Sequence, residues 1–316
     1  MTTLVGLVAN PVAGRDIRRI TARASLVPNH EKTAIVRRVL AGLDAAGVEA
    51  VRYLPDLAGV VRAALDGTHH ALAADPLAMQ LTGRAEDSTE AARLLVAEGA
   101  AVIVTLGGDG TNRAVAAGCV DVPLVAVSTG TNNVFPTMVD GTVAGLAAGL
   151  VATGRAVGDG VVRRAKRVEV AGDFALIDAA GCRDRFVGSR AIWDPERVQA
   201  IVLARAEPWN VGLSAIGGAL CPVGADEPAG LCVELGSGGP VVRVPLAPGL
   251  VLPVAVRRWR RLGLSEPVLL GDGPGTIALD GERELAVEGP TEARVTRTGP
   301  WLVDIREALR RGAGHG

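Results

Sequence analysis

The first part of the chain alternates short apolar runs with stretches of helical periodicity. Four runs have the length and β-branched content of buried strands, at 4–9, 48–54, 101–106 and 122–127. Between the first two, apolar residues recur at helical spacing over 31–46, and Gly47 provides a stop. Strands that alternate with helices predict a parallel α/β sheet.

The pattern changes after about Gly158. Short apolar runs separated by Gly and Pro turns follow at 167–170, 231–235, 241–244, 251–256 and 275–279. This pattern predicts an all-β domain. The final stretch differs again, because 293–298 has the pattern of a strand and 301–311 carries apolar residues on one helical face.

Composition narrows the class of protein. The chain has 316 residues, 48% of them hydrophobic, which suggests about two domains. Lys and Arg (33) nearly balance Asp and Glu (34), and 3% are aromatic, so nothing favours nucleic acid as a partner. The four cysteines form no CxxC pair, which favours a cytoplasmic protein without a zinc site. The longest uncharged segments are broken by Gly, Thr, Asn and Pro, so none gives the roughly 18 to 20 apolar residues that a membrane helix needs. The N-terminus lacks the basic region of a signal peptide.

Loops rich in Gly, Asn and Thr follow three of the expected strands, at 10–14, 107–111 and 128–133. In a parallel sheet these loops emerge at one edge, where ligands bind. Glycine permits positive φ and close approach of the backbone, and successive N–H groups then form an anion-binding nest. Thr111 is placed to cap a helix that starts near Asn112. The three loops therefore predict a phosphate-binding edge.

The carboxylate of Asp109 among these glycines has to be explained, because a carboxylate alone would repel a phosphate group. Asp109 makes sense if it holds Mg²⁺, accepts a proton from an attacking hydroxyl or orients that hydroxyl, as phosphoryl transfer requires. The alternative is a β-to-α turn in which Asp109 caps a helix. The chain has no GxxxxGK[ST] motif, and the GxGxxG pattern of Gly108 and Gly110 fails at Arg113. The motif indicates a nucleotide site of another type.

GGDGT after a strand, with NPVAG upstream and TGTNN downstream, resembles the superfamily of NAD kinases, diacylglycerol kinases and sphingosine kinases. GLSAIGGALCPV and ALDGEREL are similar to later segments of that superfamily. The pattern is most similar to the AcoX-type branch, which comprises NAD-kinase-like proteins named from acetoin-catabolism gene clusters. The resemblance implies a Rossmann-like α/β nucleotide-binding domain over 1–140, a β-sandwich domain over 141–290 and a C-terminal segment over 291–316 that packs back on the first domain.

The resemblance also implies a function and a site. It implies a homodimer or larger homo-oligomer that uses ATP and Mg²⁺ to phosphorylate a hydroxyl, which in NAD kinases is the 2′-hydroxyl of NAD, the step that forms NADP. Asp109 would be the general base or hydroxyl-orienting group, with Mg²⁺ near it, and Asp280 and Glu282 would close the site from the second domain. The phosphate-binding residues would be Asn10, Gly14, Gly107, Gly108, Gly110, Thr111, Thr129, Gly130, Thr131 and Asn132.

Two departures from NAD kinases leave the acceptor open. Those enzymes carry an Asn-Glu pair in a context like ALNEVVI, where this chain has Ile177 and Asp178. The TPTGS loop expected before Leu213 is replaced by EPWN at 207–210. Both features contact the NAD substrate in the family, so the phosphate side is better preserved than the acceptor side.

Further acceptor candidates come from the residues themselves. The segment 181–194 is dense in Arg, Asp and aromatic residues, which predicts either an acceptor pocket or surface turns with local ion pairs. The candidate anchors of that pocket are Asp184, Arg185 and Arg190. Asn133 and Asp178 are two more candidates beside the loops and the altered pair. Arginines at 15, 18, 19 and 23 either neutralise a triphosphate or form a solvated helix face.

Three hypotheses about function remain. The leading one is an ATP- and Mg²⁺-dependent kinase with NAD(H) as the first acceptor to test. The second is a kinase of another small hydroxylated metabolite or of a lipid, which TGTNN and 280–282 suggest although no basic amphipathic helix stands out. The third is a nucleotide or NAD sensor that kept the fold and lost phosphoryl transfer.

Overall fold

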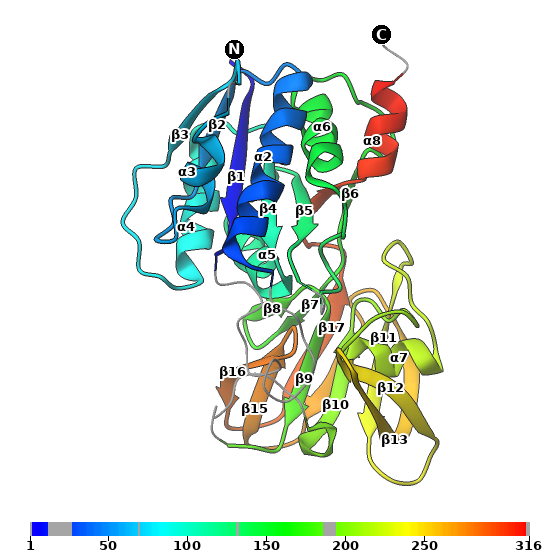
Figure 1. Cartoon of the computed structure of the whole chain (residues 1–316). Helices are drawn as coiled ribbons and strands as arrows, with labels where there is room; N and C mark the ends of the chain where they lie inside the picture. The colour runs from blue at the N-terminus through cyan, green and yellow to red at the C-terminus, as the bar shows by residue number, and fades with distance from the viewer. Residues whose placement is uncertain (1, 12–26, 69, 131–132, 186–193, 314–316) are drawn as a thin grey trace.

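The computed structural model describes residues 2–11, 27–68, 70–130, 133–185 and 194–313. The chain folds into an α/β domain and an all-β domain that lie end to end (Figure 1). The first domain is built on a seven-stranded sheet in the order β3-β2-β1-β4-β5-β18-β6, parallel except for β6. Its strands are β1 (Leu4–Ala9), β2 (Ala50–Tyr53), β3 (Ala73–Pro76), β4 (Val102–Gly107), β5 (Leu124–Ser128), β6 (Val162–Arg164) and β18 (Trp301–Val303).

Helices cover both faces of this sheet. One face packs a core of Val5, Leu7 and Val104 against α2, α3, α6 and α8, and the other packs Val8 and Ile103 against α4 and α5. The helices are α2 (Asn29–Ala45), α3 (Val60–Leu65), α4 (Glu86–Ala97), α5 (Asp109–Ala116), α6 (Gly141–Ala152) and α8 (Ile305–Gly312). Burial on both faces explains why the central strands read as continuous apolar runs.

Close packing of α2 on α6 depends on glycine. A Cβ on Gly145 would lie 2.1 Å from the carbonyl oxygen of Val39, and a Cβ on Gly42 would lie 2.4 Å from that of Thr142. Backbone cannot yield at such distances, so any side chain would force the helices apart. The glycines of these helices therefore set the thickness of this layer.

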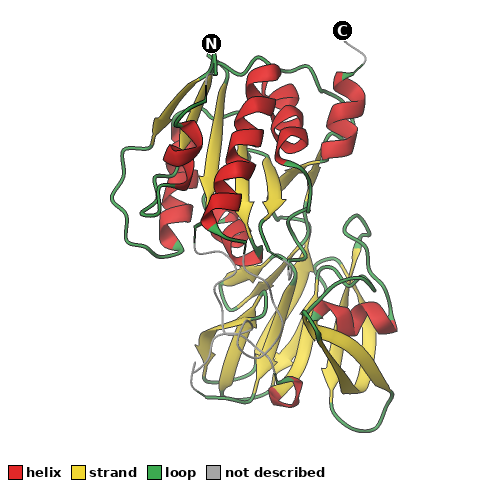
Figure 2. Cartoon of the chain, in the orientation of Figure 1, coloured by secondary structure: helices red, strands yellow, loops and turns green. Residues whose placement is uncertain are grey.

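The second domain is a sandwich of two antiparallel sheets, drawn as yellow strands in the lower half of Figure 2. The larger sheet has the order β12-β13-β11-β10-β9-β15-β16 and the smaller one β14-β17-β7-β8. The smaller sheet comprises β7 (Arg167–Val170), β8 (Asp173–Ala175), β14 (Val268–Gly271) and β17 (Thr291–Thr296). The larger one comprises β9 (Asp178–Cys182), β10 (Val198–Leu203), β11 (Ala229–Leu235), β12 (Val241–Ala247), β13 (Leu250–Gly263), β15 (Gly275–Leu279) and β16 (Glu282–Val287).

The sandwich has a core on each face of the larger sheet. Val168 and Val295 of the smaller sheet pack against Val202 and Ile277 of the larger one. Helix α7 (Ser214–Leu220) covers part of the opposite face, and a short 3₁₀ helix (Pro195–Arg197) precedes β10. The predicted combination of a parallel α/β domain with an antiparallel β domain is confirmed.

Two crossings connect the domains. The chain passes from β6 to β7 through Ala165 and Lys166, and it returns from β17 to β18 through 297–300. Backbone hydrogen bonds join the crossings, from Ala165 N to Pro300 O (2.9 Å) and from Gly299 N to Ala165 O (3.0 Å). The structure thus groups α6 and β6 with the first sheet and β17 with the sandwich. The expected domain limits at 140 and 290 would assign α6, β6 and β17 differently. The exact limits of the domains stay predictions.

Candidate functional site

The loops after β1, β4 and β5 meet at one edge, because these strands are parallel neighbours. Asn10 Nδ2 donates to Thr111 Oγ1 at 2.8 Å, which joins the first loop to the second. Thr129 N donates to Gly107 O at 3.3 Å, which joins the third loop to the second. Asn133 Nδ2 donates to Ser128 Oγ at 2.9 Å and so folds the third loop on itself. The described residues of the three glycine-bearing loops form one surface.

The glycines at this edge serve close packing. Gly107, Gly108, Gly110 and Gly130 do not have positive φ, so the expectation that they supply left-handed backbone is wrong. A Cβ on Gly107 would lie 2.5 Å from Thr111 Cβ, and one on Gly108 would lie 2.7 Å from Asn133 Oδ1. A Cβ on Gly110 meets nothing within 4 Å. The first two glycines hold the loops together, and Gly110 leaves space in front of them.

Helix α5 begins at Asp109 rather than near Asn112, and Thr111 does not cap it. Gly108 is the N-cap residue and provides no side chain, while the Thr111 hydroxyl accepts the hydrogen bond of Asn10 instead. Asn112 is fully buried; its Oδ1 accepts from Thr105 Oγ1 at 2.6 Å and its Nδ2 donates to Gly108 O at 2.9 Å. Asn112 therefore fixes the turn that carries Asp109, a role the sequence analysis missed.

Asp109 lies half-buried in the first turn of α5, and it holds the third loop. Its Oδ1 accepts from Phe135 N at 2.8 Å and from Val134 N at 3.1 Å, and its Oδ2 accepts from Val134 N at 3.1 Å. Arg205 donates from NH1 to Val134 O at 2.8 Å. The peptide group between Val134 and Phe135 thus links the Asp109 carboxylate to the Arg205 guanidinium, a role that no sequence pattern marks.

A buried lysine supports the first loop. Lys32 of α2 is 1% exposed, and its Nζ donates to Asn10 O at 3.1 Å and to Pro11 O at 2.9 Å. An ammonium buried beside two carbonyl groups anchors the chain just after β1. The expected residues Gly14, Thr131, Asn132 and Arg190, and the arginines at 15, 18, 19 and 23, lie outside the described residues.

Asp280 forms the tip of the β15–β16 hairpin and locks it against the first domain. Asp280 (φ 52°) and Gly281 (φ 79°) make a two-residue turn of the Asp-Gly kind that favours left-handed backbone. The buried carboxylate accepts from Ile177 N at 2.7 Å and Leu176 N at 3.1 Å. Arg113 of α5 lies 3.5 Å from Asp280 Oδ2. The hairpin tip is therefore tied to both domains.

Burial and charge act in opposite directions in this cluster. Burial raises the pKa of Asp280, while Arg113 and the N–H groups of Ile177 and Leu176 oppose that shift. Burial would lower the pKa of Arg113, but the negative charges of Asp280 and Glu284 outweigh it and raise the pKa. Glu284 of β16 pairs with Arg113 through NH2. Arg113, which broke the GxGxxG pattern, is thus a cation that joins α5 to the β15–β16 hairpin of the second domain.

The structure separates the expected acceptor residues into two groups. Asp178 is buried at the start of β9, where its carbonyl accepts from Asp280 N at 2.9 Å, and Glu282 lies opposite Leu279 in the hairpin. Asp184 lies beyond the other end of β9, where its Oδ1 accepts from Arg197 at 2.7 Å, and Arg185 beside it is exposed. The geometry does not bring this second group to the hairpin.

Among the residues described, no group of three or more His, Cys, Asp or Glu side chains has the arrangement of a metal site. Within the same part of the chain, the structure contains no helix with the length and apolar character of a membrane span. The described residues of this edge thus provide backbone N–H groups, one aspartate and a set of buried polar supports.

Comparison with known proteins matches both domains. Residues 5–156 match the model of the ATP-NAD kinase N-terminal domain, and residues 161–299 match that of the acetoin catabolism protein X C-terminal domain. A candidate diacylglycerol kinase from Bacillus anthracis str. Sterne has the same fold, with a TM-score of 0.52 at 14% identity over 95% of this chain and 97% of its own. The match to the kinase domain supports a kinase-type phosphotransferase.

A relative that aligns along nearly the whole chain is acetoin catabolism protein X from Cupriavidus necator. It is 40% identical over 333 aligned residues, which cover 99% of this chain and 93% of the relative. Identity of this extent reaches across both domains and includes the crossings between them. The resemblance noted in the sequence is therefore confirmed, and the chain belongs to the family of acetoin catabolism protein X.

Proposed function

We propose that the protein is a kinase that transfers a phosphoryl group from ATP to a hydroxyl group, with the 2′-hydroxyl of NAD(H) as the first acceptor to test. The observation that carries the proposal is the meeting of three loops at the β1–β4–β5 edge, with Asp109 held among them by Val134 and Phe135. The match to an ATP-NAD kinase domain supports the same chemistry.

The phosphate groups of ATP would rest on the start of α5. The first N–H groups of a helix have no partner within it and carry partial positive charge, so they attract phosphate. Gly110 in this turn has open space where a side chain would stand, which allows the phosphates to approach the backbone. The contacts of Asn10 and Thr129 with the second loop would keep this surface rigid when the triphosphate binds.

Asp109 would face the acceptor hydroxyl as its base or orienting group. Its carboxylate position is fixed by amide N–H groups, so it would need little rearrangement on binding. One carboxylate beside a phosphate surface fits Mg²⁺, since this ion often takes one or two carboxylates, several waters and substrate phosphates. Bound Mg²⁺ would neutralise charge on the phosphates, while the protein positions donor and acceptor.

The acceptor side keeps the alternatives open. Ile177 stands at the place of the asparagine that contacts NAD in NAD kinases; it is 1% exposed, and its N–H donates to Asp280. A small hydroxylated metabolite or a lipid therefore remains an alternative acceptor. A sensor that binds nucleotide without transfer is the remaining alternative, and assembly as a homodimer or larger oligomer is part of the proposal.

An ADP-release assay with Mg-ATP tests the function. The acceptor panel contains NAD, NADH, small polyols, acetoin-related alcohols and diacylglycerol in micelles, and the phosphorylated product is identified by mass. We expect Asp109→Asn to lower kcat at least about 100-fold, the lower end of what a positioned acid–base group contributes, while ATP binding is largely kept. Glu86→Gln changes an exposed acid in the first turn of α4 and is the matched control. Full turnover by Asp109→Asn would contradict the proposed role, and tight NAD binding without ADP release from any acceptor would favour the sensor.

A further inference from the structure

A cavity of about 310 Å³ lies at the junction of the two domains, next to the segment that holds Asp109, since Phe135 is part of its lining. The first domain contributes Phe135, the end of β6 and the start of α8, and the second contributes Leu176 and Arg205. None of 107–111 lines it. Its volume is near the lower end of small-molecule sites, which range over about 300–1,000 Å³. The cavity is therefore large enough for a small metabolite.

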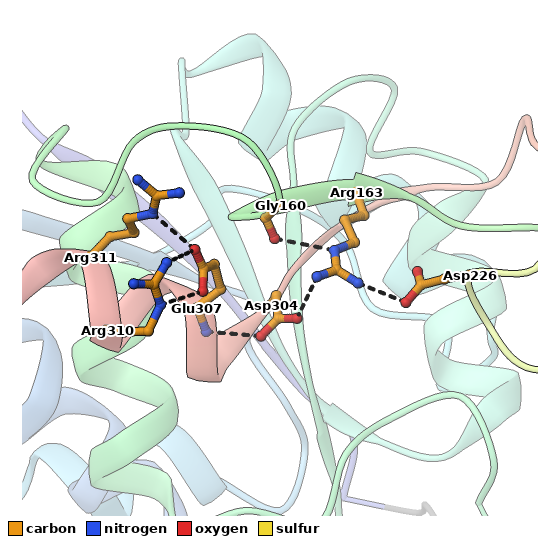
Figure 3. A network of polar contacts seen from close by, with 7 residues as sticks. All are labelled: Gly160, Arg163, Asp226, Asp304, Glu307, Arg310 and Arg311. Atoms are coloured by element: carbon orange, nitrogen blue, oxygen red, sulfur yellow. Dashed lines mark hydrogen bonds and ion pairs between the residues drawn. The ribbon is translucent and has the colours of Figure 1, made fainter.

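The walls of this cavity are basic. Its basic side chains are Arg163, Arg164, Lys166, Arg205 and Arg306, and its acidic ones are Asp226 and Asp304. Arg163 lies between both acids, 2.6 Å from Asp226 Oδ2 and 3.3 Å from Asp304 Oδ2, as Figure 3 shows. Arg164 pairs with Asp121 at 2.9 Å. Both acidic side chains of the wall thus pair with Arg163. Apart from Arg164, the cavity has three further cations that pair with neither of these acids, namely Lys166, Arg205 and Arg306.

Of those three cations, only Arg205 has a carboxylate within ion-pair distance among the described residues. Lys166 is 4% exposed, and its Nζ donates to the carbonyl groups of Gly224 (2.9 Å) and Ala229 (2.7 Å). In the described part of the chain, neither Lys166 nor Arg306 has a carboxylate within 4.0 Å, and Arg205 has one at 3.8 Å, from Glu207. Burial, together with the charges of Arg297 and Arg205, lowers the pKa of Lys166 to about 8, although Glu227 and Asp226 oppose this shift. Cations gathered at a partly buried site are stabilised by an anion.

We propose that this cavity binds a small organic anion, a phosphate monoester or a carboxylate, through Lys166, Arg205 and Arg306. Lys166 would hold the anion at the inner wall with its third N–H, and Arg306 would contact it from the exposed rim on the first turn of α8. Guanidinium and ammonium donors to a charged acceptor form the stronger class of hydrogen bond. This site goes beyond the proposed kinase function and does not depend on it.

Arg205 connects the cavity with the phosphate-binding edge. It donates to Val134 O, and the same peptide group donates its other end, Phe135 N, to Asp109 at 2.8 Å. An anion that draws Arg205 toward the cavity changes the position of this peptide and with it the third loop. Occupancy of the cavity thereby acts on Asp109 through one peptide group.

Binding measured without nucleotide tests the proposal. Calorimetry at fixed ionic strength, which keeps screening constant, compares glycerol 3-phosphate, inorganic phosphate, succinate and glycerol. We expect at least one of the anions to bind and glycerol not to bind; the phosphate and succinate arms identify the headgroup. We expect Arg306→Ala to raise the Kd of the bound anion about three- to tenfold and Lys166→Met at least about tenfold, as the loss of charged hydrogen bonds implies.

Two controls keep the result decisive. Arg243→Ala removes an exposed arginine of β12 that does not line the cavity, and it should leave the Kd unchanged. Arg306→Ala decides the outcome if Lys166→Met, which leaves two carbonyl groups without a donor, does not fold. Absence of binding by every anion, equal binding of glycerol, or an unchanged Kd in Arg306→Ala would overturn the proposal. A protein that binds the anion but releases no ADP would contradict the kinase function alone.

Discussion

The buried pair of Asp280 and Arg113 gives the sharpest prediction about stability. Asp280 is 2% exposed in its side chain, accepts three backbone N–H groups and faces Arg113 of the other domain. Asp280→Asn removes the charge and keeps a residue type that tolerates φ of 52°. Asp280→Ala would also introduce left-handed strain of about 1 kcal/mol, so the asparagine variant isolates the electrostatic part.

The expected loss is large. Breaking a buried ion pair from one side costs about 3–5 kcal/mol, because the remaining charge stays buried without compensation. Asparagine still offers one oxygen to the N–H groups of Leu176 and Ile177, and Glu284 still pairs with Arg113. We therefore expect Asp280→Asn to lower the free energy of unfolding by about 2–4 kcal/mol.

Urea unfolding followed by tryptophan fluorescence measures this loss in both domains. Trp301 of β18 reports on the first domain and Trp259 of β13 on the second. The set comprises Asp280→Asn, Arg113→Met and the double variant, with Asp272→Asn, an exposed acid of the same domain, as control. We expect the two single changes to be non-additive by at least about 1 kcal/mol, as for residues in contact.

Two results would refute the reasoning. Additivity of the two changes within about 0.5 kcal/mol would mean that the pair does not interact in solution. A loss in Asp280→Asn no larger than that in Asp272→Asn would mean that the hairpin tip is hydrated rather than buried. If the domains unfold in separate transitions, both should move, because the pair joins them.

Three further predictions concern pH and packing. The pKa of Lys166 is about 8 in the folded protein and 10.5 for a free lysine, so between these pH values the unfolded chain binds more protons than the folded one. The free energy of unfolding should therefore rise by about 1–3 kcal/mol from pH 8 to pH 10.5. Urea titrations of Lys166→Met should not show this rise. Burial would raise the pKa of Glu169, but hydrogen bonds from Arg167, Thr298 and Arg294 outweigh it and lower this pKa to about 2. In acid unfolding, the wild-type protein should therefore be more stable than Glu169→Gln by about 1–2 kcal/mol above about pH 4.5, and this difference should vanish toward pH 2. Gly107→Ala should lower the free energy of unfolding by about 1–3 kcal/mol, because the added methyl group would overpack against Thr111, whereas Gly110→Ala should raise it by up to about 1 kcal/mol. Thermal melts compare the two variants, and an equal effect of both would contradict the packing described for the two glycines.

The central strands were predictable because both faces of their sheet are buried. The run at 4–9 coincides with β1, and those at 101–106 and 122–127 differ from β4 and β5 by one or two residues. β3 was not predicted, since it is a largely exposed edge strand with the sequence AADP and no apolar pattern. β18 could not be placed from sequence, because it pairs with strands more than a hundred residues away.

The site was predictable as a set of loops and not as a set of contacts. The GGDGT motif predicted a turn at a sheet edge. The hydrogen-bond partners of Asp109 could not be predicted, because they depend on how the third loop folds back onto the second. Lys32 and Arg205 act on backbone carbonyl groups of distant residues, and no local pattern marks such a role. Asp280 was expected beside the acceptor. In the structure its carboxylate is buried between the two domains and faces Arg113 of α5, and the sequence around Asp280 shows neither the burial nor this arginine.

The position of β18 determines how late in synthesis the first sheet can be completed. The sandwich interrupts the first sheet, and residues 301–303 fill the place between β5 and β6 only after 167–296 have been synthesised. Until then the start of β5, where Leu124 pairs with Leu302, presents an open edge, which is a template for unwanted pairing. We therefore expect a fragment that stops before Trp301 to be aggregation-prone.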